Sequence, residues 1–568
     1  MGVSLIFLVC GLFLVETGES LSLDVSMGWL CGVSVSFRFS FDGFSFLYLW
    51  VVWVITGSVF VFMKIYMGDD SWLRDLSWVM VLFVISMSVL VVSGNVVTAL
   101  VGWEGLGLTS YYLIQYYGTY DGIGGAYLTG LSNRVGDVCL MLSCGIQVSG
   151  IGLKGVEMFT WAMVLLVCAA GTKSSQWPMV AWLPSAMAAP TPVSALVHSS
   201  TLVTGGVILL IRSSSWWMVV GGLNKWIFLV GLFTINVAGA GALYKDDMKE
   251  VVALSTMSHL GYMMLGLAAN KPELAMFHCC MHALCKAGLF ICVGMVMKSQ
   301  QGSQRLESVD VGVLEDSGIF GWGAYVFCFS LMGMPCMAVS MPKEQIAGMC
   351  LEWSGSLLYS GLMVSGLFLT VFYSVHLMWN MSVKGWANSV YCAEESKSIL
   401  SMGALLDSVV FFLIMCSLLL GYLGEGLIFY QWVGVSEWGD TKLVYLSFVG
   451  FTVFWCYLKG EQESWDLCWL YWPVSGGLLR GGQGIASLVH MEEVSGQLSA
   501  KVLYSVSKSV KRYGEGWAEK PYVWGVYFLK HVSSTGFNYS NTAPPVMSGL
   551  PSYWLSLLLL GLAIYVGR

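Results

Sequence analysis

Three ionisable side chains recur at every fourth position in the segment FHCCMHALCKAGLFICVG. They are His278, His282 and Lys286. On an α-helix this spacing places them on one face over two turns, a span of about 12 Å. Each group could pass a proton to the next through one water molecule, and histidine changes its charge near neutral pH. The segment therefore predicts a proton relay.

A zinc site is the alternative interpretation of the same histidines. Histidines at i and i+4 can bind a metal, but the glutamate of the HExxH motif is absent and no third ligand is apparent in the sequence. The 16 cysteines show no paired CxxC spacing, so they are interpreted as small buried hydrophobic residues rather than as a disulfide or metal framework. The proton relay is the favoured hypothesis.

A second group of ionisable residues lies in the apolar stretch from Thr172 to Arg212. It contains Lys173, His198 and the prolines Pro178, Pro184, Pro190 and Pro192. A membrane tolerates irregular backbone only where protein or a water-filled cavity covers it, and ionisable groups there usually mark an ion or proton path. Lys173 is therefore a candidate proton carrier, and an end-of-span lysine that reaches the water phase is the alternative. His198 is either a relay residue or a core histidine, and Arg212 is interpreted as an interface anchor.

Three more charged residues lie in apolar segments. Glu104, in VVTALVGWEGLGLTSYYLIQYY, has no cation nearby in sequence, so it needs one from another helix or works by changing its protonation state. A local hydroxyl such as that of Thr109 is the structural alternative. Arg134 and Asp137 are three residues apart and would be neighbours on a helix, which favours a self-neutralising structural pair.

Lysine also accompanies a second proline-interrupted span. Lys343 follows GMPCMAVSMP, in which Pro335 and Pro342 predict a helix break like that of the central stretch. Two proline-interrupted spans, each with a lysine, are typical of an internally repeated transporter. Lys249 begins a further span and is either a relay residue or an end-of-span lysine.

The elements that position these residues are expected to be membrane-spanning helices. The chain has 568 residues, of which 57% are hydrophobic and 11% charged, and its mean hydropathy is +0.72. Soluble proteins have about 25% charged residues. The net charge of −7 is small for this length and argues against a nucleic-acid partner. The segment MGVSLIFLVCGLFLV lacks a basic n-region, so no cleavable signal is expected.

About fifteen segments are apolar enough over the length that a membrane span needs. They lie near residues 1–15, 43–66, 77–94, 96–117, 122–147, 158–178, 191–212, 223–243, 251–269, 273–297, 319–340, 357–380, 404–428, 442–458 and 550–567. Residues 20–42 alternate in polarity instead, and they predict a β-hairpin at the membrane surface.

The composition changes between residues 460 and 549, where charged residues become frequent. Hydrophobic residues at every fourth position from Leu498 to Val510 predict an amphipathic helix, which lies along the membrane or forms a solvated linker. The predicted domains are an N-terminal span with the hairpin (1–42), a transmembrane core (43–459), a connecting segment with the lateral helix (460–549) and an anchor span (550–568).

Several strings resemble, in this order along the chain, the antiporter-like proton-pumping subunits of the subunit 5 type of NADH:ubiquinone oxidoreductase, respiratory complex I. They are GWEGLGLTSYYLI, NRVGD, the whole 172–212 stretch, DDMKEVVALSTMSHLGYMM, HCCMHALCKA and GMPCMAVSMPKE. The string PTPVSALVHSST also resembles the large subunit of multisubunit sodium/proton antiporters, which is the alternative family. That subunit is usually considerably longer, which favours complex I.

The resemblance implies an all-α polytopic fold of two inverted repeats, each with one interrupted helix, followed by a lateral amphipathic helix and an anchor span. It implies that Glu104 pairs with Lys173 and that Lys343 leads to the exit side. The residues predicted for the proton path are Glu104, Lys173, His198, Lys249, His278, His282, Lys286 and Lys343.

The resemblance also implies that this chain binds no cofactor, because NADH, FMN, iron–sulfur clusters and ubiquinone would bind to other subunits. The expected partners are other membrane-arm subunits, especially the neighbouring antiporter-like ones, and lipids such as cardiolipin. The expected location is the mitochondrial inner membrane, with the bacterial plasma membrane as the alternative. A purely structural subunit that clamps the membrane arm through residues 481–567 is a third hypothesis.

Three features depart from the family pattern. Two spans usually precede the segment that matches FSFDGFSFLYLW, and this chain has room for one. The usual Ser-Lys-Asp is replaced by Pro342-Lys343-Glu344, and the added proline changes the expected geometry of the break. Glu250 stands where a second basic residue usually follows Lys249, which makes the role of Lys249 less secure.

Overall fold

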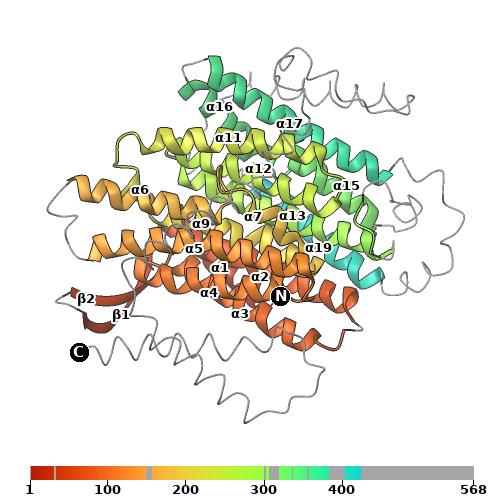
Figure 1. Ribbon diagram of the computed structural model, residues 1–568, viewed down its shortest axis with the longest axis horizontal. Helices are drawn as coiled ribbons and strands as arrows, with labels where there is room; N and C mark the ends of the chain where they lie inside the picture. The colour runs from red at the N-terminus through yellow and green to blue at the C-terminus, as the bar shows by residue number, and fades with distance from the viewer. Residues whose placement is uncertain are drawn as a thin grey trace, which may run out of the picture.

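The computed structural model describes residues 2–30, 33–68, 70–148, 156–299, 302–305, 319–334, 337–354, 357–382 and 403–423. The predicted span at 442–458, the lateral helix within 460–549 and the anchor span at 550–567 lie outside these residues. Within the described ranges the chain is built almost wholly of helices, which pack side by side in one bundle (Figure 1).

The first half of the bundle is formed by helices that match the predicted spans closely. They are α1 (Gly2–Thr17), α2 (Gly43–Tyr66), α3 (Leu73–Val92), α4 (Val96–Ile114), α5 (Tyr120–Val148) and α6 (Val156–Lys173). The second half contains α10 (Ser214–Trp217), α11 (Leu223–Tyr244), α12 (Met248–Ala268), α13 (Pro272–Ser299), α17 (Leu357–Ser382) and α19 (Gly403–Leu423). In Figure 1 the early helices lie in the lower part of the bundle, and α11, α17 and a further helix, α16 (Ser340–Ser354), in the upper part.

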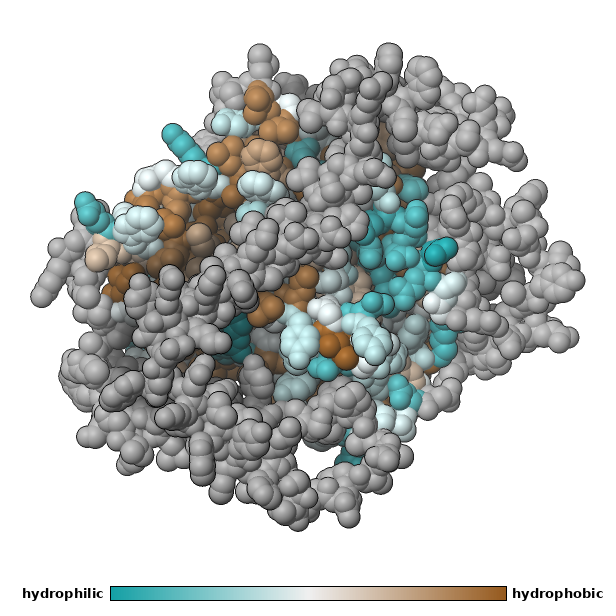
Figure 2. Space-filling view, in the orientation of Figure 1, coloured by the Kyte–Doolittle hydropathy of each residue, from teal (hydrophilic) through white to brown (hydrophobic). Residues whose placement is uncertain are grey.

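Seven of the described helices are long and apolar enough to cross a membrane. They are the helices at Gly43–Tyr66, Leu73–Val92, Thr191–Arg212, Leu223–Tyr244, Met248–Ala268, Pro272–Lys298 and Leu358–Met378. Many side chains on the outside of the bundle are large and apolar, among them Trp78, Leu131 and Trp226. In Figure 2 the described part of one face is hydrophobic toward the upper left and hydrophilic to the right of the centre. This outer surface suits a lipid environment, because lipid removes the cost of exposing apolar groups to water.

The predicted β-hairpin is confirmed. Strands β1 (Leu21–Leu30) and β2 (Val33–Phe41) pair antiparallel, with Leu21 opposite Phe41 and a shift of register between Ser26 and Gly28. Arg38 and Asp24 form an exposed ion pair across the strands, with 2.7 Å between Nε and Oδ1. The hairpin lies at one end of the bundle (Figure 1).

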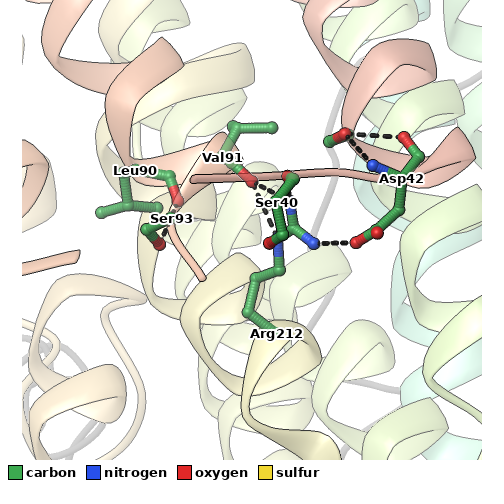
Figure 3. A network of polar contacts seen from close by, with 7 residues as sticks. Ser40, Asp42, Leu90, Val91, Ser93 and Arg212 are labelled. Atoms are coloured by element: carbon green, nitrogen blue, oxygen red, sulfur yellow. Dashed lines mark hydrogen bonds and ion pairs between the residues drawn. The ribbon is translucent and has the colours of Figure 1, made fainter. Parts of the chain in front are cut away.

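Arg212, at the end of helix α9 (Leu202–Arg212), joins this hairpin to the helices (Figure 3). Its guanidinium forms an ion pair with Asp42, which precedes α2, and donates from Nη2 to the carbonyl of Ser40 at 2.9 Å. Nε donates to the carbonyl of Val91, at the end of α3, at 2.8 Å. Because the planar guanidinium has five donors in a fixed arrangement, one side chain holds three chain segments together. Arg212 is thus an anchor between segments of this chain.

Helix α6 ends at Lys173, earlier than the predicted end of its span near residue 178. Ser174–Ala181 form an irregular segment in which Ser175 has a positive φ of 50° and the Trp177–Pro178 peptide bond is cis. Proline has no N–H to continue the helical hydrogen bonds, so the helix cannot run through Pro178. Helical structure resumes in the short α7 (Trp182–Ser185) and the 3₁₀ turn η2 (Ala186–Ala188).

The predicted span at 191–212 has the expected bounds but is not a uniform α-helix. It consists of α8 (Thr191–Leu196), a π-helical turn η3 (Val197–Thr201) and α9 (Leu202–Arg212). Pro192 lies in the first turn, where a missing N–H costs no helical hydrogen bond. Turns of π-helix inside α-helices occur frequently at functional sites, and this one contains His198.

The predicted span at 319–340 ends early, at residue 332, and the next helix begins at residue 340. Helix α15 (Ile319–Met332) ends at Gly333, which has a φ of 89°, and α16 (Ser340–Ser354) follows after a short connection. Glycine adopts this left-handed conformation without a steric cost and often terminates helices. The expectation that Pro342 breaks the helix is wrong, because Pro342 lies in the first turn of α16, where proline is tolerated.

We expect Gly206→Ala to destabilise the protein, because α9 packs closely against the end of α6 at this position. A Cβ at residue 206 would lie 2.3 Å from the carbonyl oxygen of Ala170, and backbone atoms cannot yield easily. Overpacking of this kind costs about 1–3 kcal/mol. Thermal denaturation of the purified protein in detergent measures the effect.

Gly205→Ala is the matched control. The added Cβ would lie 3.6 Å from Cδ1 of Leu106, which is ordinary van der Waals contact. Alanine also favours helix over glycine by about 1 kcal/mol, so this variant should denature at or slightly above the wild-type temperature. Equal denaturation temperatures for the two variants would contradict the close approach of α9 to α6.

Candidate functional site

The first cluster of ionisable groups lies on α4 and α5, where Asp137 is buried, Glu104 partly exposed and Arg134 exposed. Nη1 of Arg134 lies 3.1 Å from Oε2 of Glu104 and 3.3 Å from Oδ2 of Asp137. The hydroxyl of Thr109 donates instead to the carbonyl of Gly105 at 2.6 Å, so it is not the partner of Glu104 that local sequence suggested. One arginine therefore lies between two carboxylates, and the cation beside Glu104 comes from α5.

Lys173, at the end of α6, contacts Trp103 of α4. Its Nζ donates to the Trp103 carbonyl at 2.5 Å and lies 3.9 Å from the centre of the indole ring. The indole N–H donates in turn to Oδ1 of Asp137 at 2.7 Å. Lys173 and Trp103 are both fully buried. The ammonium therefore does not reach the surface of the described structure, and Trp103 lies between it and the acidic cluster.

Lys249, at the start of α12, lies near the end of the first interrupted segment, and His198 lies in the π-helical turn. Nζ of the buried Lys249 lies 3.3 Å from the carbonyl of Ala189, which directly follows η2. Glu250 pairs with Lys245 at 2.9 Å rather than with Lys249. His198 is buried in η3, and both of its ring nitrogens lack a hydrogen-bond partner in the part of the chain that the structure describes.

The three residues on α13 lie on one buried face, as their spacing predicted, and they meet groups of α12. Nε2 of His278 lies 3.4 Å from Nδ1 of His259. The rings of His259 and His282 are 5.4 Å apart between centroids. Lys286 donates to the hydroxyl of Ser255, one turn before His259 on α12. The two helices therefore bring a row of ionisable groups from α13 against a polar face of α12.

Lys343, in the first turn of α16, points back to the end of α15. Its Nζ donates to the carbonyl of Met332 at 3.0 Å and to the hydroxyl of Thr370 on α17 at 2.8 Å, and it lies 5.4 Å from the ring of Tyr262. The last carbonyls of a helix have no partner within the helix, and the helix dipole favours a positive charge there. The interruption between α15 and α16 thus supplies acceptors for a buried ammonium.

The predicted site residues form two groups in the structure. The first group surrounds Trp103 and consists of Glu104, Arg134, Asp137 and Lys173. The second group lies around the α12–α13 interface and consists of His278, His282, Lys286 and Lys343. His198 lies in η3, and Lys249 lies at the start of α12. Sequence reasoning missed Trp103 and His259. His259 could have been found from the sequence, because it is an ionisable residue within an apolar span, as His278 is. Trp103 carried none, because an apolar aromatic residue is ordinary in a membrane helix.

No group of three or more His, Cys, Asp or Glu side chains within the described ranges has an arrangement that could hold a metal ion. The third imidazole beside the α13 histidines, that of His259, does not complete such an arrangement. The ammonium groups of Lys286 and Lys343 lie close enough to His259 to act on it electrostatically, which would oppose a bound cation. The described side chains thus offer groups that accept and donate protons.

Comparison with known proteins places these residues in a family. The model of the family "NADH:quinone oxidoreductase/Mrp antiporter, TM" matches residues 93–372, which contain every predicted site residue. NADH-ubiquinone oxidoreductase chain 5 of Mytilus edulis is 36% identical over 391 residues, which cover 66% of this chain and 68% of that protein. Chain 5 of Lumbricus terrestris is 33% identical over 405 residues, which cover 70% of each. The chain belongs to the NADH-ubiquinone oxidoreductase chain 5 family.

Solved structures support the antiporter-like fold of this family member. A chain of the Mrp complex from Dietzia sp. DQ12-45-1b superposes with a TM-score of 0.66 at 22% identity, over 96% of this chain and 61% of that longer chain. A chain of the membrane-bound sulfane sulfur reductase, an archaeal respiratory membrane complex, superposes with a TM-score of 0.60 at 17% identity, over 75% of this chain and 91% of that chain. The fold is therefore that of the antiporter-like membrane proteins.

We expect Trp103→Phe to destabilise the protein more than Trp217→Phe. Both substitutions remove a buried indole donor, but Trp103 donates to a carboxylate and Trp217 to the backbone carbonyl of Leu210. Hydrogen bonds to charged groups contribute about 1.5–3 kcal/mol, and neutral ones about 0.5–1.5 kcal/mol. Thermal or denaturant unfolding in detergent compares the two variants.

A double-mutant cycle with Asp137→Asn tests the contact itself. Directly bonded residues show a coupling energy of about 0.5–3 kcal/mol, whereas distant residues contribute additively. Trp103→Phe should therefore cost less in the Asp137→Asn background than in the wild type. Additive effects would argue against the indole–carboxylate contact.

Proposed function

We propose that this chain is the proton-translocating membrane subunit of NADH:ubiquinone oxidoreductase, in which electron transfer from NADH to quinone drives proton pumping. The observation that carries the proposal is the set of buried ionisable groups within residues 93–372, the region that matches the family model. Charged groups inside a membrane protein are costly and are retained mainly for ion or proton transport. Membership of the chain 5 family gives the reaction in which this transport takes part.

Lys173 is the proposed switch. A buried ammonium that is paired with a carboxylate stays charged, whereas an unpaired one in a low-dielectric site tends to lose its proton. In the structure the carboxylate of Glu104 contacts Arg134, and Lys173 contacts Trp103. Redox energy released elsewhere in the complex would move the system between this arrangement and one in which Glu104 pairs with Lys173. Such a movement couples an electrostatic change to the binding and release of a proton.

The remaining residues form the proposed proton path. From Lys173 the proton would pass by His198 and Lys249 to the histidines and lysine of α13, and from there to Lys343. Water molecules would fill the intervals, because the ring nitrogens of His198 and His282, which have no hydrogen-bond partner within the described ranges, can each bond to one. Lys343, held at the end of α15, leads to the exit side.

The proposed architecture extends beyond the described residues. It has about fifteen membrane-spanning helices, a number set by the segments long and apolar enough to span. The helices interrupted at 174–181 and 333–339 would be the counterparts in two inverted repeats. The domains are the N-terminal span and hairpin (1–42), the core (43–459), the lateral helix segment (460–549) and the anchor span (550–568). The lateral helix would lie along neighbouring subunits.

The proposed surroundings follow from the family. The partners are other membrane-arm subunits of complex I, especially neighbouring antiporter-like subunits, together with lipids such as cardiolipin. NADH, FMN, iron–sulfur clusters and ubiquinone bind to other subunits of the complex. The proposed location is the mitochondrial inner membrane, which the animal origin of the relatives from Mytilus edulis and Locusta migratoria supports.

We expect Lys173→Ala and Glu104→Ala to abolish or uncouple proton pumping by the assembled complex. Each removes one member of the proposed switch, so the remaining charge loses its alternative partner. The measurement is the number of protons translocated per electron in vesicles that contain the purified complex. Lys225→Ala is the control, because Lys225 is exposed at the start of α11. Normal stoichiometry in both switch variants would refute this mechanism.

A sodium/proton antiporter subunit is the second candidate function. The family model includes Mrp antiporters, and the Mrp complex shares the fold, although at 22% identity this similarity concerns the fold alone. An antiporter would exchange sodium for protons in vesicles without NADH or quinone. Sodium-dependent exchange under those conditions would favour this candidate, and its absence together with NADH-driven pumping would exclude it. If neutralising every ionisable site residue left pumping intact, the chain would be a structural clamp instead.

A further inference from the structure

His259 of α12 is surrounded by the ionisable groups of the second half of the bundle. Its side chain is fully buried. The groups that act on its charge are those of His278, His282, Lys286 and Lys343, which come from two other helices. We infer that His259 is a further proton-transfer residue, which connects the histidines of α13 with the region of Lys343. This inference rests on the proposed function of the chain as a proton-translocating subunit.

The distances suit a direct proton transfer between His278 and His259. Nδ1 of His259 and Nε2 of His278 are 3.4 Å apart, and the two rings are 5.5 Å apart between centroids with an interplanar angle of 24°. General acid–base groups transfer protons at about 2.6–3.2 Å or through one water, and resting geometries are often longer. A small movement of either ring would bring the nitrogens within transfer distance.

The other nitrogen of His259 supports a role in transfer rather than packing. Nε2 is buried and has no hydrogen-bond partner among the residues that the structure describes. A buried polar atom without a partner costs free energy, and such atoms in native proteins usually mark a bound water or a functional group. This nitrogen can therefore bond to a water molecule that takes up the proton.

The ring of Tyr262 lies near both His259 and Lys343. It lies nearly one helical turn beyond His259 on α12, with 6.1 Å between the two ring centroids, and Nζ of Lys343 lies 5.4 Å from the same tyrosine ring. The relay on α13 runs along one helix from His278 to Lys286. His259 adds a lateral connection from that row toward the start of α16.

The transfer is a pair of proton movements in which no electrons change hands. An N–H bond of protonated His278 breaks at Nε2, and a new N–H bond forms at Nδ1 of neutral His259. His259 then releases the proton that it held at Nε2 to a water molecule beside that atom. His278 is left neutral, and His259 is left neutral with its proton on Nδ1. When the His259 ring then turns over, it keeps this tautomer but directs the unprotonated Nε2 toward His278, so the next proton enters at Nε2 and the proton on Nδ1 leaves to water.

His259→Gln in the intact complex tests this role. Glutamine is of similar size and can hydrogen-bond to His278, but it cannot take up a proton. We expect the complex to assemble and its proton-translocation rate per assembled complex to fall by at least about tenfold, because a positioned general acid–base group typically contributes 10²–10⁴-fold. Transfer through the substituted site should become rate-limiting, so the solvent deuterium isotope effect on pumping should rise. A structural defect would leave the isotope effect unchanged.

Met263→Leu is the matched control, because Met263 is equally buried on α12 and has no ionisable group. A wild-type pumping rate in His259→Gln would overturn the inference, and His259 would then only bridge α12 and α13 by its hydrogen bond to His278. Failure of both His259→Gln and His259→Asn to assemble would also overturn it, because the contact would then be structural. Lys173→Ala separates the two hypotheses. If it abolishes pumping while His259→Gln does not, only the role of His259 fails, and if neither matters, the proposed function fails.

Discussion

The cost of burying a positive charge determines much of this structure. An ammonium group in a low-dielectric interior needs hydrogen-bond acceptors that are not already used. A carbonyl inside a continuous helix has one lone pair left beyond its helical hydrogen bond, as at Trp103 beside Lys173, whereas the carbonyls at a helix end have no partner within the helix. Lys343 finds acceptors at the end of α15, and Lys249 finds one at Ala189 beside the end of η2. The helix interruptions thus supply hydrogen-bond acceptors for the ammonium groups of Lys249 and Lys343, in addition to any part they play in conformational change.

The buried histidines and lysines are held in different ways. The lysines Lys173, Lys286 and Lys343 each donate to at least one identified oxygen, which fixes their position. The nitrogens of His198 and His282 have no partner among the described residues. A fixed cation can change the field at its neighbours, whereas an imidazole with free nitrogens can bind water and exchange protons. The position of Lys173 therefore suits the proposed electrostatic switch, and the histidines suit proton exchange along the proposed path.

The family assignment and the geometry support each other at one point in particular. The model of the family covers the whole set of site residues, and packing gathers them into two groups although 239 positions separate Glu104 from Lys343 along the chain. In the first group, the one around Trp103, Arg134 contacts both carboxylates, those of Glu104 and Asp137. In the proposed switch, any approach of Lys173 to Glu104 would compete with this arginine.

The sequence alone determined the membrane class, most helix bounds, the hairpin and the α13 face, because hydropathy and spacing act locally. It could not determine which cation lies beside Glu104, nor that Lys343 occupies the end of α15, since these depend on how distant helices pack. It misjudged Pro342, because a proline begins a helix as readily as it ends one. His259 was visible in the sequence as a polar residue in an apolar span, but only the packing of α12 on α13 brought it to His278.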